Sequence, residues 1–361
     1  MSANYFVDLH VLQTVPPSCV NRDDTNSPKV ATYGGTLRSR VSSQAWKHAM
    51  RESFTSLFSE EALGKRTKHI VEIVEKEIMS QQPNLNVEDI ENDVIDLLTK
   101  AGLSVNSKTK ASDTLCFISK KQAEALAYVY LNRPKDEKVY TKMIKEAIKN
   151  NPSVDMALFG RMIASDASLN YDACAQVAHA ISTHEVHTEY DYFTAVDDCS
   201  PEDTSGAGHI GTVEYNSSTM YRYATVNVKE LHKLLGDETP EVVAKFAESF
   251  ILSMPTGKMN TFANRTVPDL VYVTVRTDQP VSFCGAFEKA VERGKDGYVE
   301  KSEERLFKYA EDVYSDFVSR PVFERVVGAD VFDKKRVDLK TMLKDLEAAV
   351  GDQSLEDKEV H

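Results

Sequence analysis

The chain has 361 residues, of which 42% are hydrophobic and 27% charged, enough to bury one large core or two to three smaller ones. It contains no apolar run of the roughly 18 residues that a membrane-spanning helix requires, which excludes a membrane protein. The net charge of −13 argues against nucleic acid as a partner unless the positive charges are concentrated in one place.

The N-terminal residues alternate between apolar and polar side chains and lack the basic stretch that begins a signal peptide. Over residues 5–13 this alternation predicts a strand that ends at Pro16 and Pro17. The five cysteines are scattered and never spaced as CxxC, so neither a disulfide framework nor a zinc knuckle is indicated. We therefore expect a cytoplasmic protein.

The segment from Lys29 to Arg51 contains five Lys or Arg residues and no Asp or Glu, so the rest of the chain is more acidic than the whole. A helix is predicted over 43–58, with Ser43 as its N-cap. One face of this helix is apolar and the other polar and basic. The polar face carries Gln44, Lys47, His48 and Arg51. A helix N-terminus with hydroxyls and cations is suited to binding phosphate without reading a base, although a solvated helix face is the alternative.

Helical and strand patterns occur in separate runs along the rest of the chain. Residues 60–176 are almost wholly helical by pattern and interrupt the strand-bearing part, which predicts a helical insertion. The helical patterns lie near 43–58, 65–80, 87–101, 119–131, 137–149, 239–253, 283–293 and 301–318. Further strands are predicted at Tyr221–Val228 and Leu270–Val275. This order indicates an α+β fold rather than alternating βαβ units.

Residues 197–212 are rich in Pro, Gly, Ser and Thr and lie between two strand-like flanks, 190–196 and 220–228. A loop of this length and composition predicts a long projecting hairpin. The acidic residues 351–361 are predicted to be a disordered tail.

Ordered sequence blocks are distributed over most of the chain. The first is PSC-x-NRDD followed by GG-x-x-R-x-R-x-SSQ-x-x-K-x-AMR, and the later ones are DMALFGRM, AHAISTHEV, DYFTAVDD, HIGT, YRYATVN and AFEKAV. In order and spacing these blocks resemble the CasC family, the CRISPR RNA-binding backbone subunit of the type I-E Cascade complex. They span positions from about 5 to about 291, which makes the resemblance far more specific than a single motif.

The resemblance implies a hand-shaped α+β subunit with a palm like an RNA-recognition motif, a helical fingers insertion and a projecting β-hairpin thumb. The basic loop and helix belong to the first part of the palm. The implied division is palm over 1–59, 177–189 and 223–350, the last with C-terminal helices, fingers over 60–176, thumb over 190–222 and tail over 351–361.

The resemblance also implies a non-catalytic, cofactor-free protein of antiviral defence that oligomerises into a helical filament along CRISPR RNA. It would hold the RNA phosphates and present the bases to target DNA, with other Cascade subunits and a recruited nuclease-helicase as further partners. Met162 would wedge against a base, and Thr194 would belong to the thumb. The expected RNA-binding residues are Arg22, Lys29, Arg38, Arg40, Ser42, Gln44, Lys47, Arg51, Met162, Thr194 and Lys258.

A metal-dependent ribonuclease is the alternative function. Asp23 and Asp24 occupy a loop in which related type III backbone subunits carry a catalytic Asp. Asp191, Asp197 and Asp198 are a second acidic group that could hold a divalent cation, although turn-forming acids are commoner. A third hypothesis is a generic single-strand RNA chaperone that joins no complex.

The histidine-rich stretch is not predicted to be a metal site. It contains His179, His184, Glu185 and His187. His184 and His187 lie three residues apart, whereas the zinc-protease helix needs histidines four apart with Glu next to the first. The favoured interpretation is that these are structural histidines or histidines near RNA.

Overall fold

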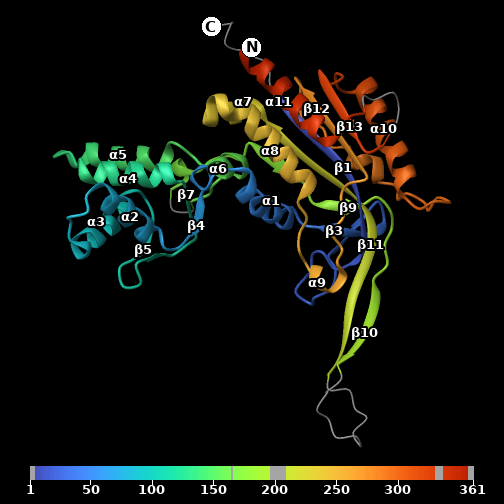
Figure 1. Cartoon of the computed structure of the whole chain (residues 1–361), viewed down its shortest axis with the longest axis horizontal. Helices are drawn as coiled ribbons and strands as arrows, with labels where there is room; N and C mark the ends of the chain where they lie inside the picture. The colour runs from blue at the N-terminus through green and yellow to red at the C-terminus, as the bar shows by residue number, and fades with distance from the viewer. Residues whose placement is uncertain (1–4, 164–165, 196–208, 330–335, 357–361) are drawn as a thin grey trace, which may run out of the picture. The chain divides into compact units, whose positions relative to one another are not determined.

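The structure, a computed structural model, describes residues 5–163, 166–195, 209–329 and 336–356 (Figure 1). This part of the chain combines helices with an antiparallel sheet, which confirms the predicted α+β class. None of its helices is long and apolar enough to cross a membrane. The chain divides into two compact units. A sheet unit comprises Met1–Met50, Val177–Thr225 and Val243–His361, and a helical unit comprises Arg51–Gln176 and Val226–Val242.

The main sheet has nine strands among the described residues, in the order β13-β12-β1-β11-β9-β3-β2, with β8 and β10 also paired to β11. Central β1 (Phe6–Ser18) pairs antiparallel with β12 (Leu270–Arg276), and this pairing ends at Leu12. The strand nevertheless continues through Pro16 and Pro17, where we predicted that it would stop. The other strands are β2 (Val30–Tyr33), β3 (Thr36–Val41), β8 (Ala175–Val177), β9 (Ala180–Ser182), β10 (Glu189–Ala195), β11 (His209–Asn227) and β13 (Phe323–Val327).

Both faces of the central strands are covered, because alternate residues of β1 and β11 pack against different helices. Leu12 and Tyr223 join a buried cluster with Phe307 of α10 (Val299–Asp316). Gln13 and Arg222 point to the other face, which carries the start of α1 (Ser43–Leu57) and α8 (Thr239–Leu252). The buried stretch of β1 therefore includes polar residues between the apolar ones.

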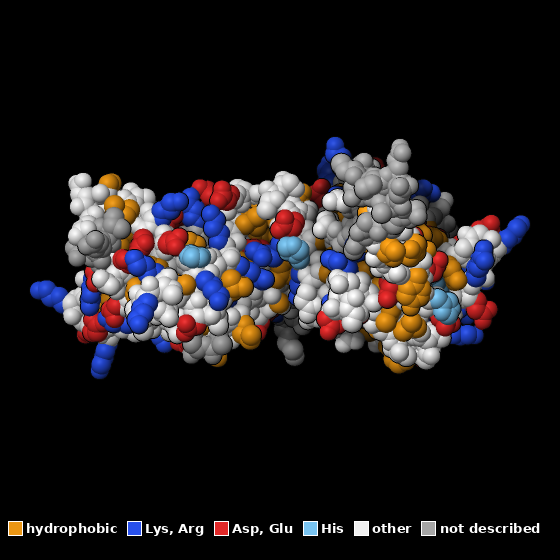
Figure 2. Space-filling view, turned by 90° about the horizontal axis from the view of Figure 1, so that it is seen from below, with side chains coloured by type: hydrophobic (Ala, Val, Ile, Leu, Met, Phe, Trp, Pro, Cys, Tyr) orange, Lys and Arg blue, Asp and Glu red, His pale blue; other side chains and the backbone are white. Residues whose placement is uncertain are grey.

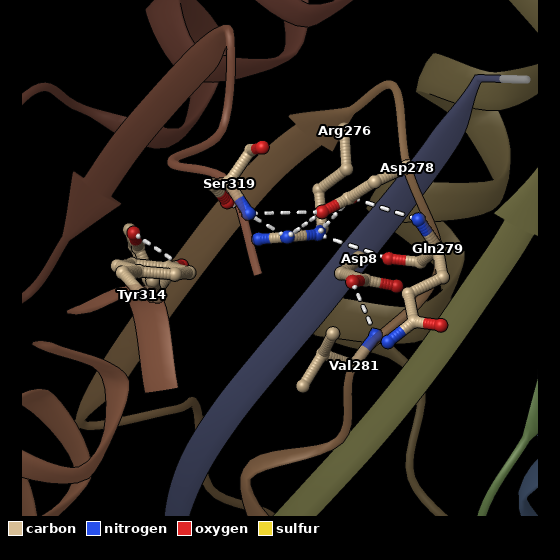
Figure 3. A network of polar contacts seen from close by, with 8 residues as sticks. Asp8, Arg276, Asp278, Gln279, Val281, Tyr314 and Ser319 are labelled. Carbon is tan, nitrogen blue, oxygen red and sulfur yellow. Dashed lines mark hydrogen bonds and ion pairs between the residues drawn. The ribbon is translucent and has the colours of Figure 1, made fainter. Parts of the chain in front are cut away.

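Arg276 and Asp8 lie in a buried polar network that connects β1 and β12 to the loop after β12 and to the segment before β13 (Figure 3). Arg276 pairs with Asp278 at 2.8 Å and donates hydrogen bonds to the carbonyls of Gln279 and Ser319. Asp8 accepts hydrogen bonds from the Tyr223 hydroxyl and the Val281 amide. Burial raises the pKa of the Asp8 carboxyl to about 6.

The predicted helix over 283–293 is wrong beyond its first turn, since only η4 (Phe283–Phe287) is helical. Arg38 donates to the carbonyls of Phe287 and Glu288, and the Val291 amide donates to Thr183. The backbone groups that a helix would pair internally therefore bind other parts of the sheet unit. The sheet unit also contains α9 (Met259–Phe262) and α11 (Leu339–Glu356).

The C-terminal helix α11 corrects a further prediction. It runs to Glu356, so the first six residues of the predicted disordered tail 351–361 are helical, and the rest lie outside the described residues. Its buried side chains Met342, Leu346 and Val350 recur at helical spacing, which holds the helix against the unit.

The hairpin of β10 and β11 extends far beyond the rest of the sheet (Figure 1). Its ladder is paired from Glu189↔Tyr215 to Ala195↔His209. β11 thus begins eleven residues before the predicted flank at 220. The predicted loop tip lies largely outside the described residues.

The helical unit has its own apolar core, which helices α2 to α5 share with a few short strands. Three of its helices match the predicted segments, but the predicted helix over 65–80 begins later, because residues 65–67 form strand β4. The elements are η1 (Glu60–Ala62), β4 (Lys65–Thr67), α2 (Ile70–Gln81), α3 (Val87–Lys100), β5 (Val105–Asn106), β6 (Ala111–Ser112), β7 (Cys116–Ile118), α4 (Lys120–Leu131), α5 (Glu137–Lys149), α6 (Val154–Phe159), η2 (Ala167–Leu169), α7 (Val228–Leu235) and η3 (Gly236–Glu238).

Candidate nucleic-acid interface

The loop from Cys19 to Lys29 is held in shape by its own polar groups. The Asp23 carboxylate accepts hydrogen bonds from the Thr25 amide, the Thr25 hydroxyl and the Ser27 amide at 2.7 to 3.0 Å. The hydrogen bond from Thr25 is the main cause that lowers the Asp23 pKa. The loop is closed at its base, where the Lys29 amide donates to Asn21 at 2.8 Å, and Arg22 projects from it into solvent.

The same loop is joined to the start of α1. The Asn21 side chain accepts a hydrogen bond from the Ser42 amide at 2.9 Å, and the Ser42 hydroxyl accepts one from the Ala45 amide at 3.3 Å. Ser42 therefore caps the helix, which corrects the prediction of Ser43. Because its amide and hydroxyl are engaged in this way, Ser42 fixes the orientation of the loop relative to the helix.

Helix α1 presents its polar face as predicted from its spacing. Gln44 and His48 are exposed and Lys47 is half-buried, whereas Trp46 and Met50 are buried. Trp46 packs on the guanidinium of Arg222, which lies 3.7 Å from its ring centroid. Burial lowers the Arg222 pKa to about 9, and the side chain donates to Gln13 of β1. This buried arginine fastens the start of α1 to the sheet.

A third segment brings Lys258 to the Cys19–Lys29 loop. A Cβ on Gly257 would lie 2.1 Å from the Val20 carbonyl oxygen, so the two backbones touch and only glycine fits there. Burial raises the pKa of the Cys19 thiol, and the nearby charges of Arg22 and Lys258 oppose that shift. Arg22 and Lys258 therefore both lie near Cys19, and Lys258 directly precedes α9.

A second group of cations lies where β3 meets the segment before β9. Arg40 lies 3.2 Å from Nδ1 of His179, so the neutral imidazole accepts this hydrogen bond and carries its proton on Nε2. The pKa of His179 is lowered by burial and by the charges of Arg40 and Lys29. Lys29 and Arg40 are also joined through their backbones, at 2.9 Å. The histidine is exposed, in a stretch for which the sequence favoured structural histidines or histidines near RNA over a metal site.

Two predicted phosphate ligands occupy other environments. Arg38 is fully buried, and its guanidinium donates to Thr36 and to the carbonyls of Ser182 and Phe287. Arg51, in the helical unit, pairs with the buried Asp155 at 3.0 Å. Both side chains hold the fold together in this structure, so we omit Arg38 from the proposed phosphate contacts and treat Arg51 separately.

Met162 and Thr194 are both accessible. Met162 is 82% exposed, although it directly follows Arg161, whose guanidinium is buried and donates to the carbonyls of Phe117, Ile148 and Leu169. A large apolar side chain in so exposed a position has no packing role within the helical unit. Thr194 lies on β10 opposite Ile210, on the extended hairpin.

The β10–β11 hairpin exposes aromatic and aliphatic side chains along its length. In Figure 2 hydrophobic side chains gather beside the grey residues of the hairpin tip. The exposed residues are Tyr190 (66%), Tyr192 (63%), Phe193 (40%) and Ile210 (57%). A Cβ on Gly211 would lie 2.4 Å from the Phe193 ring, so this ring covers the glycine across the ladder. Such a surface on a two-stranded ribbon is typical of a segment that packs on another molecule.

The groups considered as metal ligands are separated or engaged. His184 is buried, stacks on Tyr298 with ring centroids 3.6 Å apart, and accepts a hydrogen bond from the Thr219 amide. Asp191 is exposed on β10, whereas Asp197 and Asp198 lie outside the described residues. Within the described ranges, no group of three or more His, Cys, Asp or Glu side chains is arranged to hold a metal ion.

Known proteins match nearly the whole of this chain in sequence and in fold. Residues 7–350 match the Cas_CT1975 family model, described as CT1975-like protein. A solved chain described as "CRISPR RNA-guided surveillance complex, pre-nicking" is 31% identical with a TM-score of 0.79, over 96% of this chain and 100% of that one. Another, described as "CRISPR RNA-guided surveillance complex", is 28% identical with a TM-score of 0.60, over 94% and 99%. No curated protein matches the chain.

Proposed function

Because the chain belongs to the CT1975-like protein family, and resembles chains of CRISPR RNA-guided surveillance complexes over its full length, we propose that it is a backbone subunit of a Cascade complex. In this proposal it binds CRISPR RNA, contributes no catalysis, and serves antiviral defence. The observation that carries the proposal is the cationic surface of the sheet unit, which lies on an otherwise acidic protein. Its members are Arg22, Lys29, Arg40, Gln44, Lys47, His179 and Lys258.

The chemistry of this surface favours the RNA backbone over the bases. Its groups are ammonium and guanidinium ions with one amide and one imidazole, all of which can donate hydrogen bonds to phosphate oxygens, and such contacts carry no sequence information. Base pairing then supplies sequence recognition, as in other guided systems. Met162 would separate neighbouring bases and so leave the guide open for pairing with target DNA.

Self-association along the RNA is the second part of the proposal. The exposed apolar hairpin of β10 and β11 is suited to packing on the next copy of the chain. A contact between two different surfaces that does not close on itself produces a helical filament. The type I-E subtype, the other Cascade subunits and a recruited nuclease-helicase follow from the sequence resemblance to CasC.

The ribonuclease alternative receives less support. Asp23 accepts three hydrogen bonds from its own loop, which is the role of a turn-forming acid. Asp24 is exposed next to it. We expect no cleavage of RNA by the purified chain with Mg²⁺ or Mn²⁺. Cleavage that is lost in Asp24→Ala would favour the nuclease instead.

The proposal is tested by expressing the chain with a CRISPR RNA and sizing the RNA that co-purifies. Wild type should retain RNA of guide length, and Arg22→Glu with Lys258→Glu should weaken binding about a hundredfold, since two charged contacts become repulsive. Lys340→Glu with Lys344→Glu, two exposed lysines of α11, makes the same charge change as a control and should have little effect. Absence of RNA from wild type, or equal loss in both variants, would contradict the proposal.

A further inference from the structure

Two arginines of the helical unit share one aromatic ring. Arg66 on β4 lies directly opposite Phe117 on β7, with its guanidinium carbon 4.7 Å from the ring centroid. Arg51 lies 5.1 Å from the centroid of the same ring. Phe117 is buried and Arg66 is exposed. Stacking on an aromatic ring holds each planar guanidinium in a fixed orientation.

A single carboxylate accompanies this pair of arginines. Asp155 is buried, and its Oδ2 accepts hydrogen bonds from Arg51 at 3.1 and 3.0 Å. Its Oδ1 accepts from the Gly64 amide at 2.9 Å and the Ser153 hydroxyl at 2.8 Å. In the described part of the chain Arg66 takes part in no ion pair. One negative charge therefore faces two positive charges, and the excess is on the exposed arginine.

The surroundings of this pair are closely packed. A Cβ on Gly64 would lie 2.5 Å from the Phe117 ring and 2.6 Å from the Ser153 hydroxyl, so glycine is required next to Arg66. The pKa of Arg66 is lowered by partial burial and by the charge of Arg51. Repulsion between the two cations would be relieved by an anion bound at Arg66.

The segment of Met162 is linked to β7 by a hydrogen bond. The Arg161 guanidinium donates a hydrogen bond to the Phe117 carbonyl of β7 at 3.3 Å. This contact anchors Arg161, the residue just before the exposed Met162. The Phe117 ring thus contacts the unneutralised arginine, and its carbonyl oxygen binds the residue that precedes Met162.

We propose that Arg66, held against Phe117 beside Arg51, binds a phosphodiester of single-stranded RNA next to the nucleotide that Met162 contacts. The guanidinium donates two parallel hydrogen bonds to phosphate oxygens, which suits a planar donor that is already oriented. This inference rests on the proposed RNA-binding function and adds a phosphate contact in the helical unit to those of the sheet unit.

The test measures binding of a labelled single-stranded RNA by the full chain across a salt series. Arg66→Gln should lower affinity about tenfold and reduce the slope of log K against log salt by about 0.7, the loss of one phosphate contact. Arg66→Lys should recover only part of the affinity, because it keeps the charge without the planar donor. The control is Lys65→Gln on the same strand, a lysine already paired with Glu60 at 3.0 Å, which should change neither quantity.

The possible results distinguish failure of the Arg66 role from failure of the proposed function. RNA binding by wild type that is unaltered in Arg66→Gln would overturn the role of Arg66 while the proposed function stands. Failure of wild type to bind RNA would instead overturn the proposed function. A parallel series with single-stranded DNA of the same sequence should show a similar relative loss, because the phosphodiester is common to both, and a loss confined to DNA would overturn the assignment to RNA. Unchanged circular dichroism and thermal unfolding confirm that the variants are folded.

Discussion

The two units treat their surface cations differently. On the helical unit many cations are neutralised by neighbouring acids, as in Lys120 with Glu61 at 2.6 Å and Lys145 with Asp166 at 2.9 Å, and blue and red side chains are intermixed there (Figure 2). On the sheet unit Arg22, Lys29 and Lys258 form no ion pair with a carboxylate among the described residues. Cations that already have a partner gain little from phosphate, so the difference supports the proposed RNA-binding surface better than net charge does.

Arg51 gives the clearest test of what pairing contributes to stability, because its partner Asp155 is buried. Replacing Asp155 with Ala should destabilise the protein by about 3 to 5 kcal/mol, since it leaves Arg51 and the Gly64 amide without an acceptor. Glu60→Ala removes an exposed partner of Lys65 and should change stability far less, because solvent screens an exposed pair. Denaturant unfolding followed by circular dichroism compares the two variants. Equal losses would mean that Arg51 resembles the surface cations.

Asp8 of the sheet unit is a buried acid rather than a cation. The arginine near it, Arg276, pairs with Asp278 instead. The Asp8 pKa of about 6 in the folded protein lies above the ordinary value of 3.8, so the folded state binds the proton more tightly than the unfolded state. Stability should therefore fall by up to about 3 kcal/mol as the pH rises from about 4 to about 6.

The Asp8→Asn variant checks this contribution. The amide can accept from the Val281 amide and donate to the Tyr223 hydroxyl, so both partners of Asp8 are retained. Unfolding measured between pH 4 and pH 7.5 should show a smaller decrease in stability with rising pH for this variant than for wild type. The same pH dependence in both proteins would show that Asp8 does not titrate in this range.

Protonation of His179 should have a smaller effect, a severalfold change in RNA affinity. In the absence of RNA its pKa is lowered, and a bound phosphate would raise that pKa by favouring the imidazolium. RNA binding should therefore take up a proton and strengthen as the pH falls from 7.5 to 5.5. His179→Ala should weaken this dependence, whereas His69→Ala, which removes an exposed histidine already paired with Glu72, should not. Identical pH profiles for all three proteins would exclude His179 from the interface.

Local periodicity predicts the helices of this protein well, since α1, α4 and α5 depend on apolar spacing within each segment. The failures come from contacts between distant residues. Ser42 caps α1 because Asn21 orients it, and residues 288–293 are not helical because Arg38 binds the Glu288 carbonyl oxygen and the Val291 amide donates to Thr183.

In the candidate site, too, local spacing predicts some features and contacts between distant residues determine the others. Spacing on the helix identifies Gln44 and Lys47 as accessible, and their exposure agrees with it. Whether a given arginine is buried depends on partners that the local sequence does not contain. Arg38 meets Ser182 and Phe287, and Arg66 meets Phe117, each across a strand pairing or packing contact formed only in the folded chain.

The most direct test of the central claim is the salt dependence of RNA binding by the isolated chain. Arg22, Lys29, Lys47 and Lys258 should together neutralise about four phosphates, which gives a slope of roughly −3 for log K against log salt. Arg22→Ala should reduce the slope by about 0.7, and RNAs of different sequence should bind alike. A flat salt dependence in wild type, or strong preference for one RNA sequence, would contradict an interface built on contacts between surface cations and phosphates.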